Sequence, residues 1–173
     1  MKIQATLISE KISSNSREAY DLFESQRFGE RDGEKVVYML VEAFYLFKDK
    51  KMEVIDSKNR VFSEKEILKK FEKIDKKFLV NYYVFRDLRK KGYVVKTALK
   101  FGAEFRVYER GEKVGEEHSK WICFPVSENK TMTWHDFSSK NRVAHSTKKN
   151  LLIAVVDEEN DVTYFEIKWM RVG

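Results

Sequence analysis

Hydrophobic and polar positions follow two different patterns in the two halves of the chain. Up to about residue 91, apolar residues recur mainly at three- and four-residue spacing, which is typical of helices. Beyond that point they alternate with polar residues or form short continuous runs, which is typical of strands. The sequence therefore predicts an α+β fold with two domains, a small amino-terminal α+β domain over residues 1–77 and a carboxyl-terminal domain over residues 78–173.

The first domain is predicted to combine helices with short strands. Ser63 and Glu66 form the signature of a capping box at the start of a helix. Apolar residues recur at helical spacing throughout residues 35–48, so we expect one continuous helix there with a buried face. The other predicted elements are a strand over residues 2–8, a helix that Ser16 caps, and two short strands over residues 52–56 and 60–62.

The second domain is predicted to be a mixed sheet packed by helix. A helix over residues 78–91 connects the domains, and Gly92 is a suitable carboxyl-terminal cap for it. Another helix is predicted over residues 134–147, and the strand after it is apolar at nearly every position, so we expect that strand to be central. The predicted strands cover residues 93–99, 104–109, 120–126, 151–157 and 162–169.

Composition limits the kinds of partner, covalent cross-link and cellular location that the chain can have. The chain has 34 Lys and Arg against 28 Asp and Glu, and the resulting charge of +6 favours a polyanionic partner without identifying it. The single cysteine, Cys123, excludes an internal disulfide and cannot by itself anchor a metal cluster. No segment resembles a signal peptide and no window approaches the roughly 18 apolar residues of a membrane span, so we expect a cytoplasmic protein that does not associate with membranes.

Tyr108, His118 and Lys149 are residue types that can supply the three functions that cleavage of RNA without a metal requires. The reaction needs a base for the 2′-hydroxyl, an acid for the leaving 5′-oxygen and positive charge for the phosphate. Histidine titrates near neutrality and is the natural acid, whereas tyrosine, with a reference pKa of about 10, needs a neighbouring cation to become an effective base. Lys149 is therefore a candidate both to stabilise the transition state and to favour the phenolate of Tyr108.

The segments around these residues carry a resemblance to a known family. They read FRVYERG over residues 105–111, EHSK over residues 117–120 and RVAHSTKK over residues 142–149. Upstream, residues 40–46 read LVEAFYL and residues 86–93 read RDLRKKGY. Together they closely resemble the archaeal tRNA-splicing endonuclease family, in its short, single-unit subunit type. The resemblance implies an RNA-cleaving enzyme whose carboxyl-terminal domain has a restriction-endonuclease-like α/β fold with a central mixed β-sheet.

The resemblance implies a role for each residue of the triad. The tyrosine of the family's Arg-x-Tyr strand is the general base and matches Tyr108, and the histidine of its His-Ser pair is the general acid and matches His118. The lysine that ends the segment Arg-x-Ala-x-Ser-x-x-Lys matches Lys149, with Lys148 as the fallback. The implied reaction cuts precursor tRNA at bulge-helix-bulge intron–exon junctions, uses no metal or small-molecule cofactor, and leaves a 2′,3′-cyclic phosphate and a 5′-hydroxyl.

Residues near the triad are candidates for holding the RNA. In the family, the arginine that matches Arg142 stacks on an extruded bulge base, as planar cations do with single-stranded bases. Arg142 and Lys149 would project from nearly the same helical face if the helix continued through both residues. The further RNA-binding candidates are Ser119 and Ser146, and the candidate stacking partners of the arginine are Tyr164 and Trp169.

One set of catalytic residues per chain has a consequence for assembly. An intron has two splice sites, so each substrate needs at least two active copies. The resemblance implies four associated chains, preferably a homotetramer and otherwise a heterotetramer with a related structural subunit. The acidic turn over residues 157–161 resembles a loop that docks into a basic pocket of the neighbouring subunit, which makes Asp157 and Asp161 interface candidates; a solvated hairpin turn explains the same residues.

Two other functions fit parts of the sequence. Glu166 and Lys168 have the Glu-x-Lys spacing of metal-dependent nucleases of restriction-enzyme type, and Asp157 or Asp161 precedes them. The usual Pro-Asp partner, which would help to hold Mg²⁺, is absent. The basic charge and the aromatic content also suit a non-catalytic RNA-binding assembly subunit, which would bind RNA without cutting it. Cleavage in the presence of a chelator separates the metal-free enzyme from both alternatives.

Overall fold

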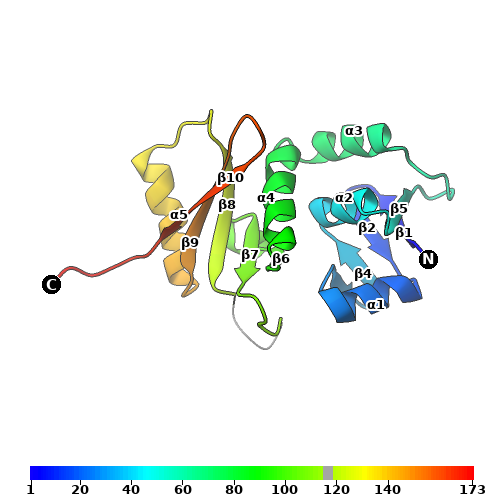
Figure 1. Cartoon of the computed structure of the whole chain (residues 1–173), viewed down its shortest axis with the longest axis horizontal. Coiled ribbons are helices and arrows are strands. Elements are labelled where there is room, and N and C mark those ends of the chain that lie inside the picture. Colours follow the sequence, from blue (N-terminus) through cyan, green and yellow to red (C-terminus); the bar gives the residue numbers. More distant parts are fainter. Residues whose placement is uncertain (115–118) are drawn as a thin grey trace. The chain divides into compact units, whose positions relative to one another are not determined.

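The structure, a computed structural model, describes residues 1–114 and 119–173 (Figure 1). The chain divides into two compact units, Met1–Tyr82 and Tyr83–Gly173. The division falls inside α4 (Phe78–Lys90), the helix that was expected to connect two domains. Helices and a mixed sheet occur together, so the predicted α+β class is confirmed.

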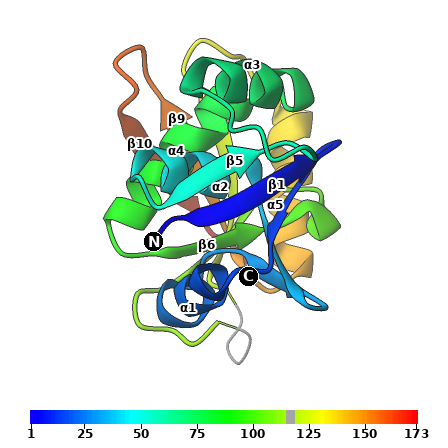
Figure 2. The same cartoon turned by 90° about the vertical axis from the view of Figure 1, so that its right-hand side faces the viewer.

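The first unit is built on a five-stranded sheet in the order β3-β4-β2-β1-β5. Only β1 and β5 run parallel, and Figure 2 shows them side by side. Apolar residues of the sheet and of the helices, such as Ile3, Ile12, Leu46 and Phe71, are fully buried and form its core. Its strands are β1 (Ile3–Ile8), β2 (Lys11–Ser14), β3 (Glu30–Asp32), β4 (Lys35–Tyr38) and β5 (Met52–Ile55), and its helices are α1 (Arg17–Gln26), α2 (Leu40–Lys48) and α3 (Glu64–Ile74).

The prediction of one helix over residues 35–48 was wrong for its first part. Lys35–Tyr38 form strand β4, and the helix begins only at Leu40. Val36 and Tyr38 are both buried and pair with β2, a spacing of two that belongs to a strand. Tertiary pairing therefore decides the conformation of four residues whose apolar positions also fit a helix.

The predicted helix ends are confirmed where side chains or glycine carry the signal. The Ser63 hydroxyl accepts a hydrogen bond from the Glu66 backbone, and the Glu66 carboxylate accepts one from Ser63. The Ser16 hydroxyl likewise caps α1. Gly92 adopts the left-handed conformation at φ 90° after α4, as a helix-terminating glycine should. Capping chemistry is local, so the sequence alone is sufficient to find it.

The second unit holds another five-stranded sheet, in the order β10-β9-β8-β7-β6. Strand β9, predicted to be central, is flanked by β8 on one side and β10 on the other, and its first four apolar residues are buried. The pair β8 and β9 is parallel, because α5 connects them, and the other neighbours are antiparallel. The elements are β6 (Val94–Thr97), a 3-10 turn at Leu99–Phe101, β7 (Phe105–Tyr108), β8 (Trp121–Ser127), α5 (Trp134–Ser146), β9 (Asn150–Val156) and β10 (Val162–Ile167).

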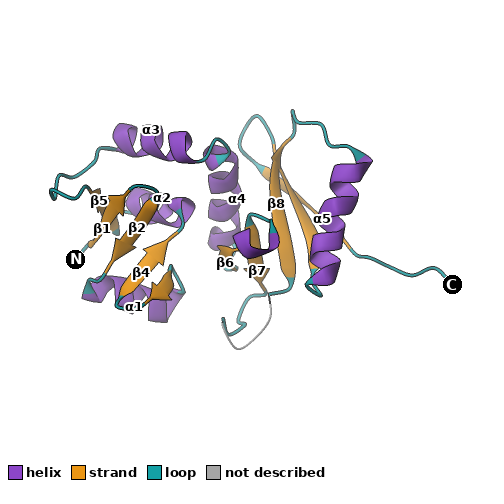
Figure 3. Ribbon diagram, turned by 180° about the vertical axis from the view of Figure 1, so that it is seen from behind, coloured by secondary structure: helices purple, strands orange, loops and turns teal. Residues whose placement is uncertain are grey.

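Helices cover the two faces of this sheet (Figure 3). Ala144 of α5 belongs to a core cluster with Ile122, Leu151 and Ile153 on one face. On the other face, Phe85 of α4 contacts Phe105 with ring centroids 6.2 Å apart. Neighbouring residues of each strand therefore point to opposite faces of the sheet, so the functional side chains are divided between the α5 face and the α4 face.

Among the residues that the structure describes, no helix is long and apolar enough to cross a membrane.

Candidate active site

Three chain segments meet at one edge of the second sheet. Strand β7 is antiparallel to β8, which is parallel to β9, so the end of β7 lies beside the starts of β8 and β9. Tyr108 is the last residue of β7, whereas Ser119 and Lys149 lie just before β8 and β9. A backbone hydrogen bond of 3.0 Å from Lys120 N to Val107 O joins two of these segments. The topology thus gathers residues that are far apart in the sequence.

The turn after α5 determines which of two adjacent lysines faces this edge. Lys148 adopts the left-handed conformation at φ 58°, and its amide donates to the His145 carbonyl at 3.0 Å. The next amide, of Lys149, donates to the Ala144 carbonyl at 2.8 Å. These two bonds form a Schellman motif, which ends the helix and reverses the chain direction. Lys148 is exposed in the turn, while Lys149 is half-buried.

The Lys149 ammonium is fixed by the backbone beside the histidine position. Its Nζ donates a hydrogen bond of 2.8 Å to the carbonyl oxygen of Ser119. Partial burial lowers the pKa of this amine, and the positive charge of Arg106 lowers it further. Lys149 is therefore a positioned cation that gives up its proton more readily than an exposed lysine does.

Tyr108 and Arg106 share one face of β7. They alternate with Phe105 and Val107, and the β8 partner of Arg106, Ile122, belongs to the core under α5. Tyr108 is only 4% exposed, and the Arg106 Nε donates to the Thr97 carbonyl at 2.8 Å. Arg106 thus lies two residues before Tyr108 and close enough to Lys149 to act on its pKa.

His118, the predicted acid, lies outside the described residues, and the first described residue after it is Ser119. Ser119 is 4% exposed, and its hydroxyl has no hydrogen-bond partner among the described residues. Its carbonyl, in contrast, accepts from Lys149. Ser119 was predicted to bind RNA, and in this structure its backbone holds the lysine.

The remaining RNA-binding candidates lie on α5. Arg142 is exposed and donates to the Ser139 hydroxyl at 3.0 Å, and the Ser146 hydroxyl donates to the Val143 carbonyl. The helix ends at Ser146, so the condition under which Arg142 and Lys149 would share a helical face is not met. Exposure leaves the guanidinium of Arg142 accessible to a ligand.

The two candidate stacking partners of Arg142 differ in position. Trp169 stacks on His145 of α5, with ring centroids 4.4 Å apart. Tyr164 lies on the opposite face of the sheet and donates its hydroxyl to Asp87 at 2.7 Å. Within one chain, only Trp169 lies on the same side of the sheet as Arg142.

Glu166 interacts with Lys168 and with Asn150. One oxygen of Glu166 lies 3.4 Å from the Lys168 ammonium and accepts a bond of 3.0 Å from the Asn150 amide. Asp161 precedes Glu166 by five residues along the hairpin, which corresponds to about 16 Å at roughly 3.3 Å per residue. Among the described residues, no three His, Cys, Asp or Glu side chains gather where they could hold a metal ion.

In the acidic turn between β9 and β10, one carboxylate accepts hydrogen bonds from backbone amides of the turn itself. The Asp157 carboxylate accepts hydrogen bonds from the amides of Glu159 and Asp161 at 2.9 and 3.0 Å. Asn160 takes the left-handed conformation at φ 67°. Asp157 therefore shapes the turn, while Glu158, Glu159 and Asp161 are exposed.

Sequence reasoning gave Arg106 no role of its own. The residue was quoted only as part of the Arg-x-Tyr motif, although a positive charge two positions before Tyr108 on a strand shares its face. That alternation is the signal that would have found it. The proximity of Arg106 to Lys149 depends on the pairing of three strands, which the sequence does not display.

Comparison with known proteins covers nearly the whole chain. The model of the family described as tRNA intron endonuclease, catalytic C-terminal domain, matches residues 78–164, and that of its N-terminal domain matches residues 3–68. Proteins named tRNA-splicing endonuclease are similar to the chain. One from Thermococcus onnurineus is 40% identical over 92% of this chain and 91% of its own length. Another, from Nanoarchaeum equitans, is 42% identical over 76% of this chain and 88% of its own.

Proposed function

Because the chain belongs to the tRNA intron endonuclease family and is an endoribonuclease of tRNA splicing, we propose that it cuts precursor tRNA at bulge-helix-bulge junctions without a metal. The proposed catalytic residues are Tyr108 as base, His118 as acid and Lys149 as the stabilising cation. The observation that carries the assignment is the sheet edge, where Tyr108 ends β7 and the Lys149 ammonium donates to the carbonyl of residue 119, next to the histidine.

The geometry supports an electrostatic role for Lys149. A cation fixed by a 2.8 Å bond to the backbone is preorganised and does not have to reorient when charge develops on the phosphate. Burial strengthens its interaction with that charge because water screens it less. Arg106, whose charge acts on the same amine, adds positive potential on this face of the sheet.

The base and acid roles complete the proposed reaction. Tyr108 takes the proton of the 2′-hydroxyl, whose oxygen attacks the adjacent phosphorus, and His118 gives a proton to the departing 5′-oxygen. The products are a 2′,3′-cyclic phosphate and a 5′-hydroxyl. The burial of Tyr108 means that the substrate has to reach its hydroxyl at the sheet edge, since the ring itself is covered.

Substrate choice is proposed to depend on RNA shape. The grooves of A-form helices hide the base edges, whereas bulges expose unstacked bases for contact with planar side chains. The exposed Arg142 on α5 is suited to this contact, and the charge of +6 favours the RNA backbone. Sequence-independent recognition of this kind fits an enzyme that processes many precursors.

The chain is also proposed to act as an oligomer, preferably a homotetramer. Each chain offers one candidate triad, while an intron has two junctions, so a single copy cannot engage both sites at once. The exposed carboxylates Glu158, Glu159 and Asp161 form an acidic surface that suits a basic pocket on a neighbouring copy.

The test of the proposed chemistry is a substrate that lacks the nucleophile. A precursor with a single 2′-deoxynucleotide on the 5′ side of the cut should resist cleavage at that junction and still be cut at the other. A metal-dependent nuclease that activates water would cut both junctions, and its products would carry 5′-phosphates. Mass spectrometry of the unmodified products should find the cyclic phosphate; 5′-phosphate ends would contradict the proposal.

A further inference from the structure

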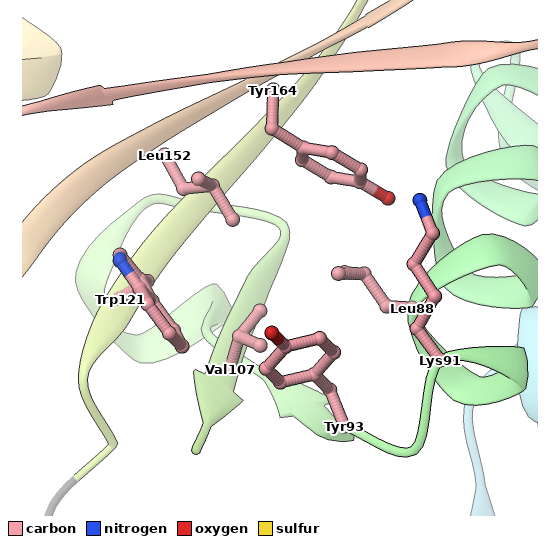
Figure 4. A pocket seen from close by; sticks show the side chains of 7 residues that line it. All are labelled: Leu88, Lys91, Tyr93, Val107, Trp121, Leu152 and Tyr164. Atoms are coloured by element: carbon pink, nitrogen blue, oxygen red, sulfur yellow. The ribbon is translucent and has the colours of Figure 1, made fainter. Parts of the chain in front are cut away.

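A cavity lies on the face of the second sheet opposite the candidate active site (Figure 4). Its volume is about 260 Å³. Val107 and Leu152 are buried and form its apolar floor on the sheet, and the buried Leu88 lines it from α4. The walls are the half-buried rings of Tyr93, Trp121 and Tyr164, together with the exposed Lys91.

The strand register places this cavity apart from the triad. Val107 and Trp121 are paired across β7 and β8 and both line the cavity, so they share a face. Arg106 and Tyr108 alternate with Val107 and point to the other face. Nothing in the proposed cleavage reaction uses the cavity.

Each aromatic wall has a cation next to its ring. Lys91 lies 5.2 Å from the centre of the Tyr164 ring, and Arg110 lies 5.2 Å from that of Tyr93. Lys120 lies 4.7 Å from the centre of the Trp121 ring. An apolar space is thus combined with three cations around it, of which Lys91 also pairs with Asp87 and Lys120 with Glu109.

Hydrogen bonds hold two of these walls in place. The Asp87 carboxylate accepts from the Tyr164 hydroxyl and from the Lys91 ammonium, both at 2.7 Å. The Tyr93 and Trp121 rings meet edge to face with centroids 5.9 Å apart. The cavity is therefore a preorganised site, which reduces the entropy lost on binding.

We propose that this cavity binds one unpaired base of the RNA substrate, with the flanking phosphates on Lys91, Arg110 and Lys120. The inference rests on the proposed function, because it concerns the same substrate. Aromatic rings joined to cations are the usual platform for single-stranded bases. The volume is below the roughly 300–1000 Å³ of drug-sized pockets and suits a single planar base.

Photo-crosslinking tests the proposal directly. Precursor RNA carrying 2′-deoxynucleotides at both cuts stays intact and is substituted with 5-iodouridine at one unpaired position at a time. Irradiation with the full-length protein followed by peptide mass spectrometry should find adducts on Tyr93, Trp121 or Tyr164. Adducts confined to other residues, with the RNA bound, would overturn the proposal.

A matched pair of substitutions measures the contribution of the cavity. Leu152→Phe fills the space from its floor, and the affinity for the uncleavable RNA should fall by roughly 5- to 100-fold, the range for loss of one stacked base. Trp134→Phe is the control, because Trp134 is 82% exposed on α5. Unchanged affinity in a folded Leu152→Phe protein would contradict the inference.

A more conservative variant tests the proposal if Leu152→Phe does not fold. Lys120→Gln changes a half-buried side chain beside the Trp121 ring, whose ammonium pairs with Glu109 at 2.6 Å, and the fold should persist. The salt dependence of RNA affinity should become shallower by about one phosphate contact. An unchanged slope would count against the site.

Cleavage by the unmodified protein distinguishes this proposal from the function on which it rests. If the protein cuts the normal precursor but shows neither crosslinks nor an effect of cavity filling, only the cavity proposal fails. If it neither binds nor cuts that RNA, the proposed function fails and the inference fails with it.

Discussion

Two adjacent lysines, Lys148 and Lys149, have different environments, and we therefore expect them to have different tasks. The first occupies the left-handed position of the Schellman turn and is exposed. The second is half-buried, with its ammonium bonded to the Ser119 carbonyl. We expect Lys149→Met to slow single-turnover cleavage by about 100- to 1000-fold, as loss of a preorganised electrostatic contact does. Lys148→Met should leave the rate within a few-fold, and equal losses in both variants would refute the assignment.

Arg106 should control the proton affinity of Lys149. Replacing it with glutamine removes a positive charge that lowers the pKa of the amine, so that pKa should rise. The rise should be partial, because burial is the larger cause and remains. Nuclear magnetic resonance of ¹³C-labelled lysine side chains measures the titration, with Arg106→Lys as the charge-preserving control. A fall in the pKa, or no change, would show that the two residues do not interact.

At the residue scale, sequence predicted the identity of candidates better than their environment. The motif spacing was sufficient to propose Lys149 and Tyr108. Burial of Tyr108 and the bond from Lys149 to Ser119 depend on three strands that meet at one edge, so they could not be derived from local pattern. The two-residue alternation that links Arg106 to Tyr108 was available and was not used.

Among the elements, the end of α5 carries a measurable strain. A residue with a side chain in the left-handed conformation costs about 1–2 kcal/mol, whereas glycine adopts it freely. Glycine also loses more entropy on folding, about 0.5–1 kcal/mol. Lys148→Gly should therefore stabilise the protein by about 0.5–1 kcal/mol in denaturant unfolding, and Lys148→Val should destabilise it. A glycine variant that is less stable than the unchanged protein would contradict the turn geometry.

The start of α3 predicts an acid-dependent loss of stability. A hydrogen bond from Arg60 and another from the Ser63 backbone lower the pKa of Glu66 from 4.5 to about 2. A carboxyl group whose pKa is lowered by folding stabilises the fold at pH values above its ordinary pKa of 4.5. This stabilisation is lost as the pH falls from about 4.5 towards 2. Glu66→Gln should flatten this part of the curve of unfolding free energy against pH. Parallel curves for the two proteins would show that the carboxylate is not coupled to folding.

The elements that sequence missed are those whose pattern is ambiguous in a short window. Residues 35–38 fit both a helix and a strand, and the pairing of β4 with β2 and β3 decides between them. Strand β3 is exposed along its whole length, so it has no hydrophobic alternation to detect. The helix ends at Ser16, Ser63 and Gly92 were predictable, because caps depend on residues within one turn.

At the scale of the whole molecule, the acidic turn predicts the state of association. Reversing the charges of Glu158, Glu159 and Asp161 to lysine should dissociate the proposed tetramer, because it opposes a basic pocket with positive charge. Asp157 is left unchanged, since its carboxylate holds the turn. Light scattering gives the mass, and an exposed charge reversal elsewhere, Glu72→Lys on α3, is the control. An unchanged mass would remove the docking role.

The α+β class and the family were predictable for the whole chain, because they depend on patterns that extend over many residues. The order of the strands was not, since β1 pairs with β5 and β8 with β9 across long connections. The cavity beside Trp121 could not be predicted from the sequence either. Its lining residues come from α4, the turn that follows α4, and strands β7, β8, β9 and β10, and only the folded sheet brings them together.

The most direct test of the central claim is cleavage of an end-labelled bulge-helix-bulge RNA by the purified chain in excess EDTA, with His118→Ala in parallel. The account predicts cuts at both junctions in EDTA, with cyclic-phosphate ends, and none with the variant. Cleavage only after Mg²⁺ is restored, or full activity of His118→Ala, would contradict it.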